Sequence, residues 1–430
     1  MRIHSLHLQN YKSFTEREFN FHPQFNLLAG PNGAGKTSLL DALAIAAGSW
    51  FLGVRGADSR HIRSEEVRLQ AFESAVGMHW EAQYPCRIQA NGEVLQTSLS
   101  WTRSLHGPGG RTTQTDARQL KKLALQADSA VRQGGNLDLP LLSYYGVGRL
   151  WQEPRDDYQV QDARKLDLRM SRLDGYLNSV DPRLSVKHLS RWIAQQTWIA
   201  YQRGADTQLW QVVRQALLLC LEGGEDLYFD AKLGEIVVNL RGRLQPFSNL
   251  SDGQRCMLAL VGDIARKACI LNPHLGPDVL LHTRGMVLID ELDLHLHPAW
   301  QQHVVEDLRT CFPGLQFICS THSPFLIQSL RSGDELLLLE GAAPDQLAHR
   351  PLQEIVRQVQ KVTHTETSLR YAEQHNVASE YLQELERLQN LPPEERDAAL
   401  SQLADTLTPY AENPAFQAVL ERKRVAKLGV

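Results

Sequence analysis

The chain has 430 residues, 43% of them hydrophobic, which is enough for about two or three domains with a substantial buried core. Its formal net charge of −4 excludes an overall basic field of the kind that holds nucleic acid or an anionic membrane, so any DNA contact must be local. No run of about 18 apolar residues occurs, and we therefore predict neither a signal peptide nor a membrane span. Six cysteines without C-x-x-C spacing predict free, buried thiols and a cytoplasmic location.

The first predicted elements are strands that lead into a glycine-rich loop. Alternating apolar residues over 1–30 predict antiparallel strands, residues 25–29 form a short apolar strand, and an apolar helix follows over 38–45. Between this strand and this helix the chain fits the phosphate-loop pattern G-x-x-x-x-G-K-S/T without a mismatch. The residues of this phosphate loop are Gly30, Pro31, Asn32, Gly33, Ala34, Gly35, Lys36, Thr37 and Ser38.

The phosphate loop predicts a nucleotide site. Its glycines let successive backbone N–H groups converge on phosphate oxygens, and the helix that follows adds the positive end of its dipole. Lys36 supplies a cation for the outer phosphates, and Thr37 supplies a hydroxyl for Mg²⁺. Lys12 lies in a predicted turn, where a solvated side chain is a better interpretation than a second phosphate contact.

The next stretch predicts scaffold. Residues 84–94 resemble a hairpin whose turn is Asn91-Gly92. Residues 139–145 predict a central strand that delivers the loop 146–149 to the ligand-binding edge of a sheet. Between them lies a basic cluster, which is either a local DNA contact or a solvated helix face. Its residues are Arg111, Arg118, Lys121 and Lys122.

Helical periodicity over 160–223 carries several tryptophans, which core packing explains better than a nucleic-acid surface does. Two short strands precede the loop 247–255, and a helix with apolar residues at helical spacing follows this loop. Ser251 is a natural N-cap of that helix, and Gly253 leaves its first turn open to an anion.

Two acids end the apolar strand at 286–289. Acids at the carboxyl edge of a parallel sheet lie beside the phosphate loop, so we expect Asp290 to hold Mg²⁺. We expect Glu291 to orient or deprotonate a water that attacks the γ-phosphate. His295 and His297 have no third ligand nearby, and a turn explains them better than a metal site does.

A further strand over 316–321 ends at His322, which emerges where the γ-phosphate must lie, and a last strand follows over 335–339. Residues 352–430 show short amphipathic helices without recognisable chemistry, which predicts an interaction region. Its apolar faces fold back on the head, join two copies or dock a partner. These faces carry Leu382, Leu385, Leu388, Leu400, Leu403 and Leu407.

Together these motifs resemble the ABC-type ATPase head of the RecF, SMC and OLD lineage. The phosphate loop matches Walker A, and 250–255 match the signature loop LSGGQ, with Asp252 where glycine is usual. Residues 288–291 match Walker B, and His322 matches the switch histidine. The resemblance implies an α/β fold, a mixed sheet with a P-loop, with a compact helical insertion and a helical C-terminal tail.

The resemblance also implies how nucleotide is bound. ATP and Mg²⁺ are the expected ligands, and two heads close around them as a homodimer or higher oligomer. Ser251, Gly253 and Gln254 of one chain then face the γ-phosphate bound by the other. The glutamine-loop residue that reaches the metal is Gln152 by this comparison, with Gln159 or Gln161 as alternatives.

The domain organisation follows from the same comparison. We predict an N-terminal ATPase lobe over 1–150, a helical insertion over 151–225, a C-terminal ATPase lobe over 226–345 and a helical interaction region over 346–430. The separation of Lys36 from Asp290 is too short for the long coiled coil of SMC proteins. No glutamate followed by D-x-D appears after the last strand, so the nuclease half of OLD proteins is not expected.

A narrower resemblance rests on three sequence segments, at 144–151, 172–176 and 424–429. These segments look like those of the small stand-alone ATPases of bacterial defence systems, including the ATPase subunit of Septu. It implies an ATPase that restricts phage with a partner HNH-type nuclease acting on DNA. The alternatives are a RecF-like repair factor and, less favoured, the ATPase subunit of a transporter. A neighbouring nuclease gene would favour the defence ATPase. A neighbouring replication gene would favour the repair factor, and a permease gene would favour the transporter subunit.

Overall fold

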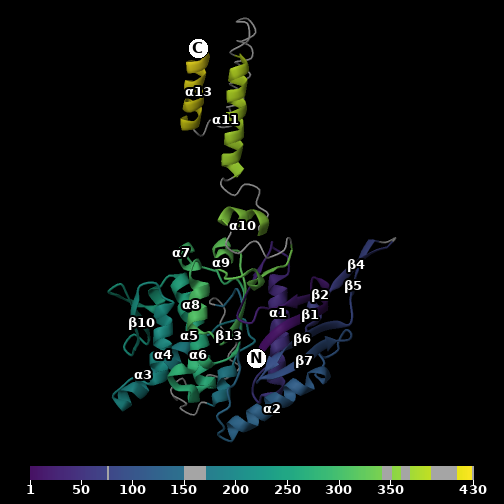
Figure 1. Cartoon of the computed structure of the whole chain (residues 1–430), viewed down its shortest axis with the longest axis vertical. Helices are drawn as coiled ribbons and strands as arrows, with labels where there is room; N and C mark the ends of the chain where they lie inside the picture. Colours follow the sequence, from purple (N-terminus) through teal and green to yellow (C-terminus); the bar gives the residue numbers. More distant parts are fainter. Residues whose placement is uncertain (75–76, 150–170, 341–350, 360–368, 389–413, 429–430) are drawn as a thin grey trace. The chain divides into compact units, whose positions relative to one another are not determined.

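A computed structural model describes residues 1–74, 77–149, 171–340, 351–359, 369–388 and 414–428 (Figure 1). The chain divides into two compact units, Met1–Gln360 and Lys361–Val430. The first unit contains the phosphate loop, the signature loop, the two acids after residue 289 and His322.

The centre of the first unit is a parallel sheet, in which five described strands follow the order β14-β3-β13-β12-β8. These strands are mostly buried apolar runs because helices cover the sheet, as is typical of parallel sheets. Among the described strands, the one predicted at 139–145 is the last in this order, so the prediction of a central strand was wrong for the described sheet. The strands are β3 (Phe25–Ala29), β8 (Leu141–Tyr145), β12 (Gly285–Ile289), β13 (Leu315–Ser320) and β14 (Leu336–Leu338).

A second sheet is antiparallel and has the order β2-β1-β6-β7 within the described part of the chain. Helix α1 (Lys36–Ala47) contacts strands of both sheets and is buried on nearly all sides, which explains its uniformly apolar sequence. The α/β class expected from the motifs is therefore confirmed. The strands are β1 (Arg2–Tyr11), β2 (Phe14–Asn20), β6 (Cys86–Val94) and β7 (Thr97–Leu105).

The predicted turn at Asn91-Gly92 is wrong. Strand β6 runs through both residues, and the turn to β7 lies at Leu95 and Gln96, whose φ angles are 49° and 63°. Gly92 has a different role, because a Cβ atom there would lie 2.2 Å from the carbonyl oxygen of Arg2 on the neighbouring strand. The glycine permits close approach of two backbones. The residues next to Gly92 in sequence could not distinguish a close backbone approach inside a strand from a turn.

The two smaller sheets flank the core. A hairpin of β4 (Leu69–Ser74) and β5 (Gly77–Ala82) projects from the first unit in Figure 1. Its cross-strand register places Met78 and Trp80 on one face, and these side chains are exposed. The other sheet has the order β11-β10-β9. Its strands are β9 (Gly224–Asp230), β10 (Glu235–Leu240) and β11 (Arg243–Pro246).

Helices α3 and α4 carry the aromatic residues of the predicted helical stretch. Trp192 and Trp210 are buried and meet edge to face, with ring centroids 6.3 Å apart, which confirms the core interpretation for both. Trp198 and Tyr201 stack on each other but are exposed, so core packing does not explain them. The longer helices of this unit are α2 (Arg118–Arg132), α3 (Val186–Arg203), α4 (Gln208–Leu219) and α5 (Asp252–Leu271).

The remaining helices of the first unit are short. The segment between β12 and β13 contains two of them, α7 and α8. The short α-helices are α6 (Val279–His282), α7 (Pro298–Gln301), α8 (Val304–Cys311), α9 (Pro324–Gln328) and α10 (Leu352–Val359). The 3-10 helices are η1 (Gly48–Gly53), η2 (Ser64–Glu66), η3 (Thr115–Ala117), η4 (Arg172–Tyr176), η5 (Phe247–Asn249), η6 (Pro273–Asp278) and η7 (Gly333–Glu335).

The second unit contains α11 (Leu369–Leu388) and α13 (Pro414–Leu428). Leu385 and Leu388 of α11 are buried with Leu420 of α13, so these two helices cover part of each other's apolar surface. The predicted apolar face at 400–407 lies outside the described residues.

All six cysteines lie in described segments and are buried free thiols, as their spacing predicted. Burial raises the pKa of Cys269 to about 12, which suits an inert packing role. A search of the described helices finds none with the length and apolarity that crossing a membrane requires.

Candidate nucleotide site

The predicted motifs meet at one edge of the parallel sheet. The phosphate loop follows β3, the acids Asp290 and Glu291 follow β12, and His322 follows β13 closely. Because these strands are parallel and adjacent, their carboxyl ends lie at the same edge. The loop 146–149 follows β8 at this edge too.

The phosphate loop has the backbone that its glycines predict. Gly33 and Gly35 have φ angles of 82° and 96°, in the left-handed region that glycine adopts readily. Gly35 directly precedes α1, and a Cβ atom there would lie 2.7 Å from the ring of Phe14. The loop therefore curves tightly into the N-terminus of a helix, where backbone N–H groups attract anions.

Lys36 is the buried cation of this loop, with 8% of its surface exposed. Its Nζ atom donates hydrogen bonds to the carbonyl oxygens of Gly30 at 2.8 Å and Pro31 at 3.0 Å. Burial lowers the pKa of Lys36, and the charges of Asp290 and Glu291 oppose this effect. The ammonium group thus lies within electrostatic reach of the acids after β12.

Asp290 is joined to the first turn of α1 and to the end of β13. Thr37 Oγ1 donates a hydrogen bond to Asp290 Oδ2 at 2.8 Å, and Ser320 Oγ donates to Asp290 Oδ1 at 2.5 Å. Asp290 is 2% exposed. A carboxylate and two hydroxyls form an all-oxygen set of the kind that Mg²⁺ prefers, so these residues fit the metal that the sequence predicts.

Glu291 is held through its backbone. Its φ angle of 48° is left-handed, which is unusual for a residue with a side chain, and its N–H donates to Ser320 Oγ at 2.7 Å. Asp293 joins the same turn to the end of β13, because its Oδ1 atom accepts from Thr321 Oγ1 at 2.5 Å and from the backbone N–H of His322 at 3.3 Å. The structure therefore brings His322 close to the turn that contains Glu291.

Ser320 and Asp293 were not predicted as site residues. Both carried a usable signal, since each is a polar residue within four positions of a predicted strand end at the ligand-binding edge. Their side chains accept or donate hydrogen bonds that orient Asp290, Glu291 and His322. Ser320 and Asp293 therefore hold the predicted site residues in place through hydrogen bonds.

The signature loop begins α5 as predicted. Ser251 Oγ accepts from the N–H of Gln254 at 3.3 Å, and the side chain of Gln254 accepts from the N–H of Ser251 at 3.0 Å, which is a capping box. A Cβ atom on Gly253 would lie 2.6 Å from the carbonyl oxygen of His295. Gly253 thus permits α5 to pack directly on the turn after β12.

His297 has a structural role. Its Nδ1 atom accepts from the N–H of Ala299 at 3.2 Å, so His297 is the N-cap of α7 at the end of the predicted turn. Within the described part of the chain, no group of three or more histidine, cysteine, aspartate or glutamate side chains is arranged to hold a metal. Gln152, Gln159 and Gln161 lie outside the described residues.

Lys12 is not a solvated turn lysine, so that interpretation was wrong. Its Nζ atom contacts the carboxylate of Asp41 on α1. Arg60 Nη1 lies 2.5 Å from Asp41 Oδ1, and the hydroxyl of Tyr144 donates to the same oxygen at 3.1 Å. Burial raises the pKa of Asp41, but Arg60 and Lys12 outweigh it and leave the pKa below its ordinary value. The cluster anchors α1 behind the phosphate loop.

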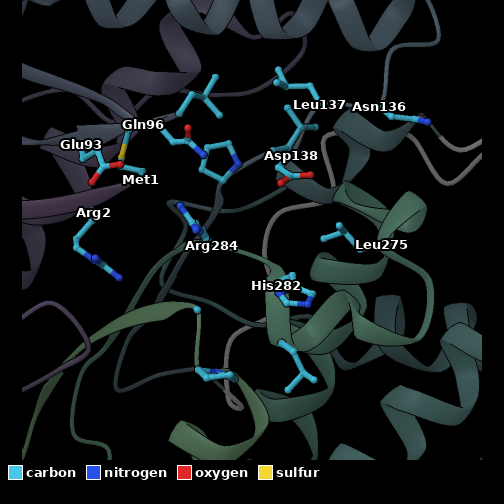
Figure 2. Close-up of a pocket in the computed structure, with 16 residues that line it drawn as sticks. Met1, Arg2, Glu93, Gln96, Asn136, Leu137, Asp138, Leu275, His282 and Arg284 are labelled. Carbon is cyan, nitrogen blue, oxygen red and sulfur yellow. The ribbon is translucent and has the colours of Figure 1, made fainter.

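The large pocket in Figure 2, of about 830 Å³, lies elsewhere. Arg284 in its lining precedes β12, and Gly314 precedes β13, so the pocket lies at the amino ends of the strands. The phosphate loop follows the carboxyl end of β3, at the opposite edge of the sheet. This pocket is therefore distinct from the candidate nucleotide site.

The chain is similar to a family of AAA domains and to proteins of retron and Septu systems. A family described as "AAA domain" matches residues 5–195. "Retron Vc95 probable ATPase" from Vibrio cholerae is 24% identical over 77% of this chain and 72% of its own length. "Septu protein PtuA" from Bacillus thuringiensis is 22% identical over 76% of this chain and 73% of its own length.

Among solved structures, the "SMC head domain from Thermotoga maritima" aligns with 80% of this chain and 97% of its own, at 17% identity and a TM-score of 0.41. The family match and the curated relatives confirm the recognition made from the motifs. The chain resembles a retron ATPase and PtuA over most of its length.

Proposed function

We propose that this chain binds ATP with Mg²⁺ at the carboxyl edge of the parallel sheet and hydrolyses the γ-phosphate. The observation that carries the proposal is the hydrogen-bonded set of Thr37, Asp290 and Ser320. It joins the phosphate loop to the two strand ends that bear Glu291 and His322. This is the arrangement that phosphoryl transfer to water needs, with charge, metal ligands and an acceptor at one point.

Each residue has a separate role in this proposal. The N–H groups of the phosphate loop and the Lys36 ammonium hold the phosphates, while Thr37 and Asp290 hold Mg²⁺. When bound, the metal neutralises charge on the phosphate oxygens. Glu291 orients the attacking water and accepts its proton, and His322 contacts the γ-phosphate.

Phosphate release and calorimetric ATP titration test this function directly. Asp290→Asn keeps the shape of the side chain but removes the charge, so we expect weaker Mg²⁺-dependent binding and loss of phosphate release. Asp116→Asn is a matched control, because Asp116 is an exposed acid in η3. Phosphate release by the parent chain that persists in excess chelator would contradict the role of Mg²⁺.

The proposed active form is a homodimer or higher oligomer of heads. Ser251, Gly253 and Gln254 of one chain would face the γ-phosphate bound by another chain. The exposed capping box of Ser251 and Gln254 supports this assignment for these two residues, because it lies at the N-terminus of α5. Gly253 is buried against the turn after β12, so its predicted openness to an anion is not seen in the single chain. Size measurement with and without ATP, in a chain that cannot hydrolyse it, tests the association.

We further propose that the ATPase is a subunit of an anti-phage defence complex, which regulates a partner HNH-type nuclease acting on DNA. The names of the relatives that align over most of the chain support defence over DNA repair or transport. DNA contact through the basic cluster is part of this proposal, since Arg118 and Lys122 are exposed on α2. Capture of a nuclease from the native host would test the partnership.

A further inference from the structure

Arg149 donates hydrogen bonds to the backbone carbonyl oxygens of Asp290 and Glu291, the two acids after β12. This arginine follows the loop after β8 and is 1% exposed. Its Nη1 atom donates to the carbonyl oxygen of Asp290 at 2.7 Å, and its Nη2 atom donates to the carbonyl oxygen of Glu291 at 3.0 Å. The planar, rigid guanidinium can hold two acceptors at a fixed spacing.

The same side chain reaches the signature helix. Arg149 Nε donates to the Sγ atom of Cys256 at 3.3 Å, and Cys256 lies in the second turn of α5, shortly after the capping box of Ser251. The main chain of Arg149 is itself anchored, because its N–H donates to the carbonyl of Gly146 and its carbonyl accepts from the N–H of Leu184. One fixed residue therefore bridges α5 and the turn that bears Glu291.

The backbone of Glu291 needs such support. A left-handed φ of 48° is unfavourable for glutamate and persists only where the surroundings enforce it. Two side chains bond its peptide groups: Ser320 accepts from its N–H, and Arg149 donates to its carbonyl. Ser320 belongs to the parallel sheet, whereas Arg149 also contacts a helix whose start is exposed. A shift of α5 can thus reach Glu291 through Arg149.

We propose that Arg149 is a positioning residue that couples the start of the signature helix to the orientation of Glu291. Contact of another molecule with the start of α5 is transmitted by the guanidinium to the backbone of Glu291. Arg149 itself does not contact the reacting atoms. This inference rests on the proposed ATP hydrolysis and names how that site is regulated.

The competing explanation is that Arg149 only stabilises the fold, and a second buried arginine provides the control. Arg103 is 0% exposed and donates from Nε to the carbonyl of Thr113 at 2.9 Å, among residues outside the nucleotide site. Methionine has a length similar to that of arginine but no donors. Arg149→Met and Arg103→Met therefore remove comparable buried networks, one within the proposed coupling and one outside it.

The first readout separates kcat from binding. In Arg149→Met we expect kcat to fall by more than about tenfold while the Kd for ATP stays within about threefold of the parent value. Arg149→Lys should recover part of the rate, because it restores a donor. Arg103→Met should lower the melting temperature at least as much and keep the parent kcat. Parent-like kcat in Arg149→Met would overturn the inference.

Hydrogen exchange gives a readout that does not require turnover. In the parent chain kept monomeric by dilution, so that no second chain presents its ATP to the signature region, ATP with Mg²⁺ should change amide exchange in the phosphate loop and in residues 251–257. In Arg149→Met the first change should remain and the second should disappear. If the second change remains, the coupling is wrong. If the parent binds ATP but releases no phosphate, hydrolysis fails as a function, and the exchange comparison still decides the coupling.

Discussion

Thr37 and Asp290 are 253 positions apart in sequence and share a hydrogen bond of 2.8 Å. The bond joins the first turn of α1 to the residue after β12, across the edge of the parallel sheet. It follows from topology, since β13 lies between β3 and β12 and its Ser320 completes the same set.

The first prediction concerns the phosphate-loop lysine. Lys36→Ala should weaken ATP binding by at least about tenfold without unfolding the chain, because the role of Lys36 is electrostatic and it contacts loop carbonyls rather than apolar neighbours. Calorimetric titration measures the change. Lys121→Ala on α2 is the control for loss of a lysine. Equal affinity in Lys36→Ala and the parent would remove Lys36 from the site.

The second prediction concerns Glu291, whose backbone φ angle is left-handed. Glu291→Gln keeps the shape of the side chain but removes the charge that aligns and deprotonates water. ATP binding should persist, while turnover should fall by about 10²-fold or more. The variant should therefore retain bound ATP. Steady-state phosphate release at the parent rate would exclude Glu291 from this role.

Much of the candidate site was predictable from sequence because each motif ends a strand of one parallel sheet. Polar residues after buried strands collect at the carboxyl edge, so Lys36, Asp290 and His322 could be placed together without knowing the register. Supporting contacts were not predictable in the same way. Arg149 acts through hydrogen bonds to the backbone carbonyl oxygens of Asp290 and Glu291, far away in sequence, and no local pattern predicts such partners.

The errors in the fold have a common physical origin. Gly92 was interpreted as a turn, because the local pattern Asn-Gly favours one, but tertiary packing against Arg2 required the glycine inside a strand. Lys12 was interpreted as solvated, because loop charges usually are, but Asp41 pairs with it across 29 positions. In each case a distant neighbour overrode a local preference.

The third prediction tests the close approach at Gly92. Gly92→Ala should lower the free energy of unfolding by roughly 1–3 kcal/mol, because the added methyl group would meet the carbonyl of Arg2. Gly107→Ala is the control, since a Cβ atom there has no neighbour within 4 Å, and its effect should stay within about 0.5 kcal/mol. Denaturant titration measures both. Equal stabilities for the two variants would contradict the packing argument.

The fourth prediction tests composition of the site from two chains. Lys36→Ala removes the phosphate contact, and Ser251→Arg blocks the start of α5 with a large side chain. Each variant alone should be inactive, but a mixed dimer should contain one intact site made from the unaltered phosphate loop of one chain and the unaltered signature of the other. The mixture should therefore recover phosphate release. No recovery, with heterodimers demonstrated, would show that the site is not shared.

The last prediction assigns the partner contact to the second unit. A chain ended after Gln360 keeps Ile355, which is fully buried in the core of the first unit, so we expect it to fold and bind ATP. Val419 and Val425 of α13 remain exposed in the full chain and would be lost with the second unit. The shortened chain should therefore fail to capture a nuclease from the native host, whereas the full chain should capture one. If both capture it equally, the second unit is not the docking surface. If the purified full chain alone cuts DNA, the division of labour between ATPase and nuclease is wrong.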